Sequence, residues 1–247
     1  MSDLHVHTVY CDGKSTPEEM VLSAIDKGLK KIGVLCHSHV EFDLECCVAL
    51  DKEGEFIKEV NALKEKYKDK IEVLCGIEQD YFSKPSSYDY DYKIGSVHYF
   101  LLNGKYYAID QSSDDFVALI NNQFGGDYYL AVELYYQMVS KVVEVTKPDI
   151  IAHIDLITKF NENDKLFSTS HPRYIKAWKS AVDKLLTYGI PFEINTGVIS
   201  RGYKSAPYPS NEILSYLKKG GAKLVINSDA HHEKGVAFEF EKWKKLL

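Results

Sequence analysis

Short apolar segments alternate with longer amphipathic segments along most of the chain, and this order predicts alternating strands and helices. Most of the apolar segments are followed by a predicted helix, which is typical of a parallel sheet. We therefore expect an α/β fold whose seven strands close into a barrel. The predicted strands cover Asp3–His7, Lys31–Cys36, Ile71–Ile77, Tyr92–Val97, Asp149–Ile154, Pro191–Asn195 and Lys223–Asn227.

Local signals support several of the elements between these strands. Thr16, followed by Pro17 and by Glu19 three positions on, predicts a helix start with a capping box. Asn103-Gly104 lies between two apolar segments and predicts a hairpin. The other predicted helices cover Glu53–Tyr67, Ser113–Asn122, Asp127–Thr146, Pro172–Tyr188 and Asn211–Lys219.

Composition narrows the class of protein. The length of 247 residues suits one α/β barrel domain, and the net charge of −6 offers no basic surface for nucleic acid. No apolar segment reaches the ~18 residues of a membrane span. Five cysteines, with no CxxC pair and no signal peptide, predict reduced thiols in a cytoplasmic protein. Nothing in the sequence predicts an oligomeric state.

Histidines and carboxylates stand where the predicted strands end. In βα barrels the carboxyl ends of the strands surround the active site, so we expect these side chains to converge at one mouth. One His-x-His pair is weak evidence for a metal, but six of the nine histidines share this placement. Such a set without cysteine favours an open catalytic site for Zn, Mn or Fe. These residues are His5, His7, His37, Glu78, His98, His153, Asp229 and His231.

Seven segments together resemble the PHP (polymerase and histidinol phosphatase) superfamily, and within it the histidinol-phosphatase branch. The resemblance spans nearly the whole chain. The segments are DLHVHT at 3–8, IGVLCH at 32–37, GIEQDY at 76–81, DYKIGSVH at 91–98, IIAHIDLITKF at 150–160, FEINTGVISRGYKSAPYPS at 192–210 and INSDAHH at 226–232.

The resemblance implies one PHP metal-dependent phosphoesterase domain over residues 1–247, folded as a distorted seven-stranded barrel with three divalent metals. The implied ligands of the first metal are His5, His7, Glu78 and Asp229. Glu78 would bridge to a second metal, which His98 and His153 complete. The implied ligands of the third are Asp12, His37 and His231. The chain departs from the family at Cys36, where Asp is common, and His39 is a second candidate beside His37.

The implied activity is hydrolysis of L-histidinol phosphate in histidine biosynthesis, with a hydroxide that bridges two metals as nucleophile. Glu78, Asp229 and His231 are candidate catalytic side chains, and Asp229, His231 and water are the alternatives left open as proton donor to the leaving alkoxide. Arg201 stands where this branch places a phosphate-binding basic residue, and it is one of only two arginines. The other arginine, Arg173, and the neighbouring His171 are further candidates for substrate contacts.

Asp3 shares a strand face with His5 and His7 and is expected to hydrogen-bond to a ligand histidine. Glu193 and Asn195 share one face of the strand over Pro191–Asn195 and are expected to orient ligands or substrate. Two other functions stay open at this point. One is a PHP phosphoesterase acting on a different small phosphomonoester or on phosphotyrosine. The other is a non-catalytic PHP module, which the intact set of candidate ligands disfavours.

Overall fold

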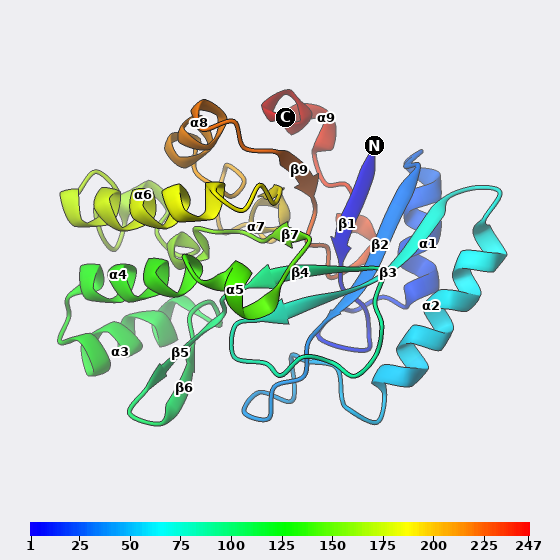
Figure 1. The fold of residues 1–247 in the computed structure, drawn as a ribbon, viewed down its shortest axis with the longest axis horizontal. Helices are drawn as coiled ribbons and strands as arrows, with labels where there is room; N and C mark the ends of the chain where they lie inside the picture. Colours follow the sequence, from blue (N-terminus) through cyan, green and yellow to red (C-terminus); the bar gives the residue numbers. More distant parts are fainter.

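Seven parallel strands form a nearly closed barrel in the computed structural model, which describes all 247 residues (Figure 1). The strand order is β1-β2-β3-β4-β7-β8-β9. A parallel bridge from Val6 to Ala230, and a hydrogen bond of 2.8 Å from Leu4 N to Asn227 Oδ1, bring β1 beside β9. The strands are β1 (Ser2–Val6), β2 (Lys31–His37), β3 (Glu72–Asp80), β4 (Tyr92–Ser96), β7 (Ile150–Ile151), β8 (Phe192–Asn195) and β9 (Leu224–Asn227).

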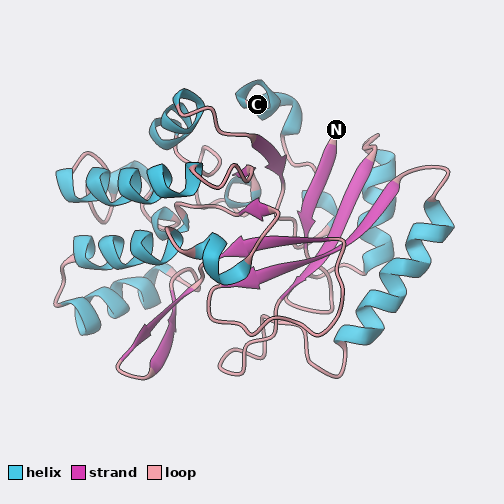
Figure 2. Ribbon diagram, in the orientation of Figure 1, coloured by secondary structure: helices cyan, strands magenta, loops and turns pink.

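Helices surround the barrel, with α1 and α2 on one side and α3, α4 and α6 on the other (Figures 1 and 2). The hairpin of β5 (Tyr99–Leu102) and β6 (Lys105–Ala108) projects from the sheet. No helix is long and apolar enough to cross a membrane. The helices are α1 (Pro17–Asp26), α2 (Glu53–Tyr67), α3 (Ser113–Phe124), α4 (Tyr128–Val139), α5 (Val142–Thr146), α6 (Pro172–Leu186), α7 (Gly197–Ser200), α8 (Asn211–Lys219) and α9 (Phe240–Trp243). Short 3-10 turns are Leu156–Thr158, Glu162–Asp164, Glu233–Gly235 and Lys244–Leu246.

Successive side chains along a strand point to opposite faces of the sheet, so the core has one layer between strands and helices and another inside the barrel. On β2, Ile32, Val34 and Cys36 pack against the residues of α1 and α2. Leu35 points to the opposite face and joins a small cluster contributed by the strands themselves, including Tyr92. The barrel is therefore filled by few apolar side chains, which leaves its carboxyl end for polar ones.

Tyr92 fits inside the barrel because two neighbouring strands carry glycine beneath it. A Cβ on Gly33 or Gly76 would overlap the Tyr92 side chain. The Tyr92 hydroxyl continues across the sheet and donates to Leu4 O at 2.7 Å. This side chain thus connects β4 to β1 across β3 and β2.

The predicted capping box and hairpin are confirmed. Thr16 accepts from Glu19 N, and the Glu19 carboxylate accepts from Thr16 N. Asn103 and Gly104 both have positive φ, as a tight hairpin turn requires.

Two predicted elements are shorter than expected. The helix expected over Asp127–Thr146 is divided into α4, which ends at Val139, and α5, which begins at Val142. Between them the Ser140 hydroxyl donates to Gln137 O, and such side-chain bonds compete with the backbone bonds of a helix. The strand expected over Asp149–Ile154 forms only over Ile150–Ile151, and its backbone bonds to β4 end with Ala152 N, which donates to Gly95 O at 3.0 Å. Its continuation is replaced by a side-chain contact, because His153 N donates to Glu193 Oε2 at 3.1 Å.

We predict that Gly76→Ala lowers the free energy of unfolding by about 1–3 kcal/mol, because the added methyl group overpacks against Tyr92. Urea denaturation monitored by circular dichroism measures the change. In a Tyr92→Leu background the same substitution should cost less. An equal cost in both backgrounds would contradict the packing argument.

Candidate metal centre and substrate cavity

Glu78 lies at the centre of the converging side chains and is fully buried. Its Oε1 is 3.2 Å from His153 Nε2 and 3.4 Å from His98 Nε2. Its Oε2 is 3.0 Å from His37 Nδ1, 3.3 Å from His5 Nε2 and 3.4 Å from His7 Nε2. The two oxygens thus face two different sets of imidazoles, which is the arrangement a bridging carboxylate needs.

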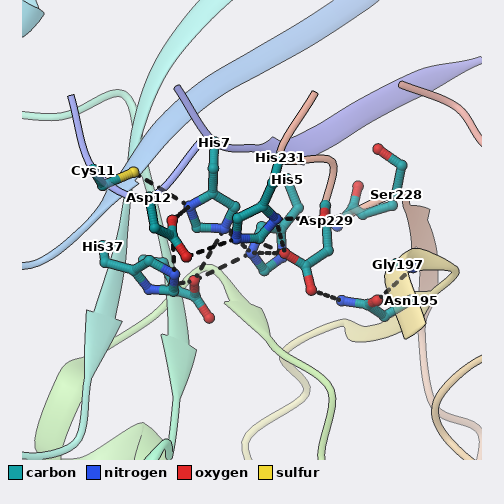
Figure 3. Close-up of polar contacts among 12 residues, drawn as sticks. His5, His7, Cys11, Asp12, His37, Asn195, Gly197, Ser228, Asp229 and His231 are labelled. Carbon is teal, nitrogen blue, oxygen red and sulfur yellow. Dashed lines mark hydrogen bonds and ion pairs between the residues drawn. The ribbon is translucent and has the colours of Figure 1, made fainter. Parts of the chain in front are cut away.

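The candidate ligand atoms form three overlapping groups. Figure 3 shows the side chains of His5, His7, Asp12, His37, Asp229 and His231 pointing towards one another. Asp12 approaches from the loop after β1, with Oδ2 3.1 Å from His231 Nε2 and Oδ1 3.7 Å from His37 Nε2. Within each group the ligand atoms lie within 4.8 Å of one another. The groups are His5, His7 and Asp229; His37, Glu78 and His98; and His7, Asp12, His37 and His231.

Glu193 on β8 accepts hydrogen bonds from residues of this cluster. Its Oε1 accepts from His5 Nδ1 at 2.7 Å, which leaves His5 Nε2 directed at Glu78. Its Oε2 accepts from His153 N. Asn195, two residues on, donates to Glu193 Oε2 and to Asp229 Oδ2. The expected support from Glu193 and Asn195 is thus present as hydrogen bonds to candidate ligands.

Asp3 has a different role from the one expected. It is fully buried, but its carboxylate accepts from the Ser228 hydroxyl, from Ser228 N at 2.9 Å and from Ala237 N at 2.8 Å, and from no histidine ring. Because these partners follow β9, Asp3 fixes the segment that carries Asp229 and His231. It acts on the backbone rather than on a ligand.

The two candidates at the end of β2 point in different directions. His37 faces Glu78 and Asp12. The His39 ring instead contacts Val48 O at 3.0 Å and does not line the cavity. His232 is similarly turned away, in an ion pair with Glu233.

Arg201 approaches Asp229 closely. Its guanidinium donates to Asp229 Oδ2 and to Asp229 O, each at 2.9 Å, and contacts His231 Nδ1 at 3.0 Å. Gly197 makes room for this contact, because a Cβ there would lie 2.8 Å from Ser228 O and 2.9 Å from Asp229 Cβ. Asp229 itself has a left-handed backbone with φ of 49°.

A cavity of about 400 Å³ opens above these residues. Its floor is formed by seven of the nine candidate ligands, all but His5 and His7, together with Arg201. The outer wall includes residues that sequence analysis did not select, among them Asp80, Asp110 and Lys159. Lys159 lies in a segment quoted for the family resemblance, but Asp110 follows the hairpin and has no recognisable sequence signal.

Aromatic contacts join the two segments that form the outer rim. The Phe42 ring, in the loop after β2, stacks on Tyr106 at the hairpin with 3.6 Å between ring centroids. It also meets Tyr99 edge-on at 4.9 Å. We call Phe42, Tyr99 and Tyr106 the rim cluster, and it fixes the hairpin against the loop.

Comparison with known proteins now identifies the family. The sequence model of the family described as PHP domain matches residues 3–197. The chain belongs to the PHP domain family.

Individual PHP relatives are similar over nearly the whole chain. Histidinol-phosphatase of Bacillus subtilis (strain 168) is 26% identical over 263 residues, covering 97% of this chain and 96% of that protein. A solved protein from Listeria monocytogenes has a TM-score of 0.85 at 21% identity, covering 98% of this chain and all of its own. The solved histidinol phosphate phosphatase of Lactococcus lactis has a TM-score of 0.73 at 20% identity, covering 99% and 91%. These structures share the fold of this PHP domain.

The remaining sequence candidates, His171 and Arg173, lie outside the cavity of this PHP domain. The His171 ring caps α6 by accepting from Arg173 N, and it stacks on Tyr129 of α4. Arg173 donates to both oxygens of Glu133 and to Asp127. These contacts join α6 to α4, and the expected substrate contacts have no counterpart in the structure.

Buried carboxylates control the charge of the imidazoles. Burial by itself would lower the pKa of His98, but the adjacent Glu78 and Asp80 outweigh it and raise this pKa to about 9. Burial is likewise outweighed at His5 and His7, whose pKa values are raised by neighbouring carboxylates. At Asp229, burial opposes ionisation, but Arg201 and the histidines hold its pKa well below the usual range. Protons therefore compete with a metal at the His5, His7 and His98 rings.

We predict that divalent metal binding releases protons and tightens as the pH rises from 6 to 8. Protonated His98 stabilises the metal-free protein fully below its ordinary pKa, and this contribution is lost as the pH rises through about 9. A metal requires the neutral ring and competes with that proton. Calorimetric titration of Mn²⁺ in two buffers of different ionisation enthalpy measures both effects. His232→Gln is the control outside the cluster, and affinity independent of pH would contradict the prediction.

We further predict that Glu193→Gln lowers metal affinity about 10- to 100-fold. An amide NH₂ in place of Oε1 would face the donors of His5 and Asn227, and in place of Oε2 it would face Asn195 Nδ2 and His153 N, so donors oppose each other in either orientation. Competition with a chromophoric chelator measures the affinity. Glu233→Gln removes a similar charge outside the cluster and should leave the affinity unchanged; equal losses in both variants would refute the supporting role.

Proposed function

We propose that this PHP domain is a metal-dependent phosphomonoester hydrolase that converts L-histidinol phosphate and water to histidinol and phosphate. The observation that carries the proposal is the cluster of histidines and carboxylates at the floor of the cavity, with Arg201 beside it. The Bacillus subtilis relative named histidinol-phosphatase supports this substrate. So does the similar Lactococcus lactis structure, which is described as a complex with Zn, L-histidinol and phosphate.

The donor set suits divalent metals. Glu78 and Asp229 each place a buried carboxylate among imidazoles, and cations are the partners that such groups require. The more exposed Asp12 adds a third carboxylate beside His231. We propose three ions of Zn, Mn or Fe, divided among the ligands as the family resemblance implies. Such ions supply activation of water and neutralisation of phosphate charge when bound.

The protein's own cation is expected to bind the substrate phosphate. Three hydrogen bonds hold the Arg201 guanidinium against Asp229 and His231. Two of its five N–H groups remain without a partner in the protein. Arg201 would therefore orient Asp229 and also donate to a phosphate oxygen, where charge grows during hydrolysis.

The cavity favours a small substrate over the other functions considered. A volume of about 400 Å³ suits a metabolite-sized phosphomonoester. A phosphotyrosine phosphatase would have to accommodate a peptide at this mouth, between the loop after β2 and the hairpin. The non-catalytic alternative is disfavoured because seven of the nine candidate ligands line the cavity, and the other two, His5 and His7, contact Glu78 behind them.

We place the reaction in the cytoplasm. All five cysteines are unpaired, which suits a reducing compartment.

We predict that the metal-loaded protein hydrolyses histidinol phosphate with a kcat/KM at least about 10-fold above that for phosphotyrosine or sugar phosphates. Phosphate release from a substrate panel after reconstitution with Mn²⁺ or Zn²⁺ measures this ratio. His98→Ala should remove both metal and turnover while circular dichroism stays unchanged. Equal rates across the panel would contradict the substrate, and full turnover by His98→Ala would contradict the metal cluster.

A further inference from the structure

The cavity is acidic beyond the candidate metal ligands. Four further carboxylates line it, Asp43, Glu45, Asp80 and Asp110, and Asp80 is already bonded to His98 N. The only lysine in the lining is Lys159. A phosphomonoester brings two negative charges of its own, which the metals and Arg201 would take up. The remainder of a substrate that fits this wall is therefore cationic rather than anionic.

Asp110 is held next to the metal cluster by the backbone. The preceding residue, Ile109, donates its N–H to His98 O at 2.8 Å, which fixes Asp110 beside a candidate ligand. Asp43 is further out, in the loop after β2, where it accepts from the Tyr99 hydroxyl at 2.9 Å. Glu45 is exposed at the rim.

Lys159 holds Asp110 in place. Its ammonium donates to Asp110 O at 2.6 Å and to Asp110 Oδ2 at 3.0 Å. The same ammonium lies over the Phe160 and Tyr203 rings, 5.5 and 4.9 Å from their centroids, and Lys159 is only 9% exposed. The Lys159 ammonium thus has two oxygen partners and two aromatic neighbours, and it fixes Oδ2 of the Asp110 carboxylate.

The second oxygen of Asp110 is free to bind a ligand. Oδ1 makes no hydrogen bond within the protein, and the side chain is 26% exposed towards the cavity that it lines. A fixed carboxylate with one unpaired oxygen is suited to an ammonium donor. Because Lys159 is already bonded to the carbonyl as well, it does not compete for Oδ1.

We propose that Asp110 binds an ammonium group located on the carbon next to the phosphate-bearing carbon of the substrate. This rests on the proposed function, since histidinol phosphate carries its amine at that position. With the phosphate at the metal cluster, the adjacent amine reaches the wall beside His98, where Asp110 lies. Asp110 would thereby select 2-amino phosphomonoesters over phosphomonoesters that lack the amine.

The test compares two substrates that differ only in the amine. Wild type, Asp110→Asn and Asp114→Asn are assayed with histidinol phosphate and with its deamino analogue. Asp114 is exposed in the first turn of α3, outside the cavity, and its variant removes the same charge. We expect wild type to prefer histidinol phosphate over the analogue by about 10- to 100-fold in kcat/KM, mainly through KM. Asp110→Asn should remove most of this ratio, and Asp114→Asn should keep it.

The outcomes separate this inference from the proposed function. Wild type that hydrolyses p-nitrophenyl phosphate but not histidinol phosphate would refute the proposed substrate. Wild type active on histidinol phosphate, but with equal kcat/KM for the deamino analogue, would overturn only the ammonium site, whatever the stability of the variants. A ratio lost in Asp43→Asn and kept in Asp110→Asn would overturn the assignment to Asp110. Equal losses for both substrates in Asp110→Asn would do so as well, because they indicate a positioning effect through Lys159.

Discussion

The burial of Glu78 among five imidazoles is the interaction on which the site depends. An isolated carboxylate at this depth would be strongly unfavourable, so its charge must be matched by the surrounding rings or by metal ions. The rings come from β1, the ends of β2 and β4, and the segment after β7. A barrel satisfies this requirement, because its parallel strands deliver their ends to one small volume. The few apolar side chains inside it leave that volume to the polar cluster.

Glu193 makes the site and the closure of the barrel interdependent. Its two oxygens accept from His5 on β1, from the backbone after β7, from Asn195 on β8 and from Asn227 on β9. Asn227 in turn accepts from Leu4 N and so connects the first strand to the last. The hydrogen bonds that orient a candidate ligand are therefore the same ones that hold the sheet edges together. The short pairing of β7 follows from this, since Glu193 replaces a strand partner for His153.

The helices, the strands and the cluster of candidate metal ligands are better predicted from the sequence than the residues of the cavity wall. Helix starts such as Thr16 and the turn at Asn103-Gly104 have local causes, and strand periodicity places His5, His37 and His98 at one end of the barrel. The break after Val139 depends on a hydroxyl contact that propensity does not reveal. Asp3 and Arg173 find partners distant in sequence, which no local pattern specifies. Asp110 escapes prediction because only the path of the hairpin brings it beside His98.

The rim cluster belongs to a different part of the chain from the metal-facing residues. The metal-facing residues are built on strands and their immediate ends, whereas Phe42, Tyr99 and Tyr106 belong to a loop and a hairpin that touch mainly each other at the rim. Mutation of these three side chains would alter the shape of the entrance. The two segments themselves stay bonded to the site, because Val48 N donates to His37 O at 3.1 Å and Ile109 N donates to His98 O at 2.8 Å. Replacement of the side chains of Phe42, Tyr99 and Tyr106, with the segment lengths kept, is therefore the change expected to exchange one phosphorylated metabolite for another at the same hydrolytic centre.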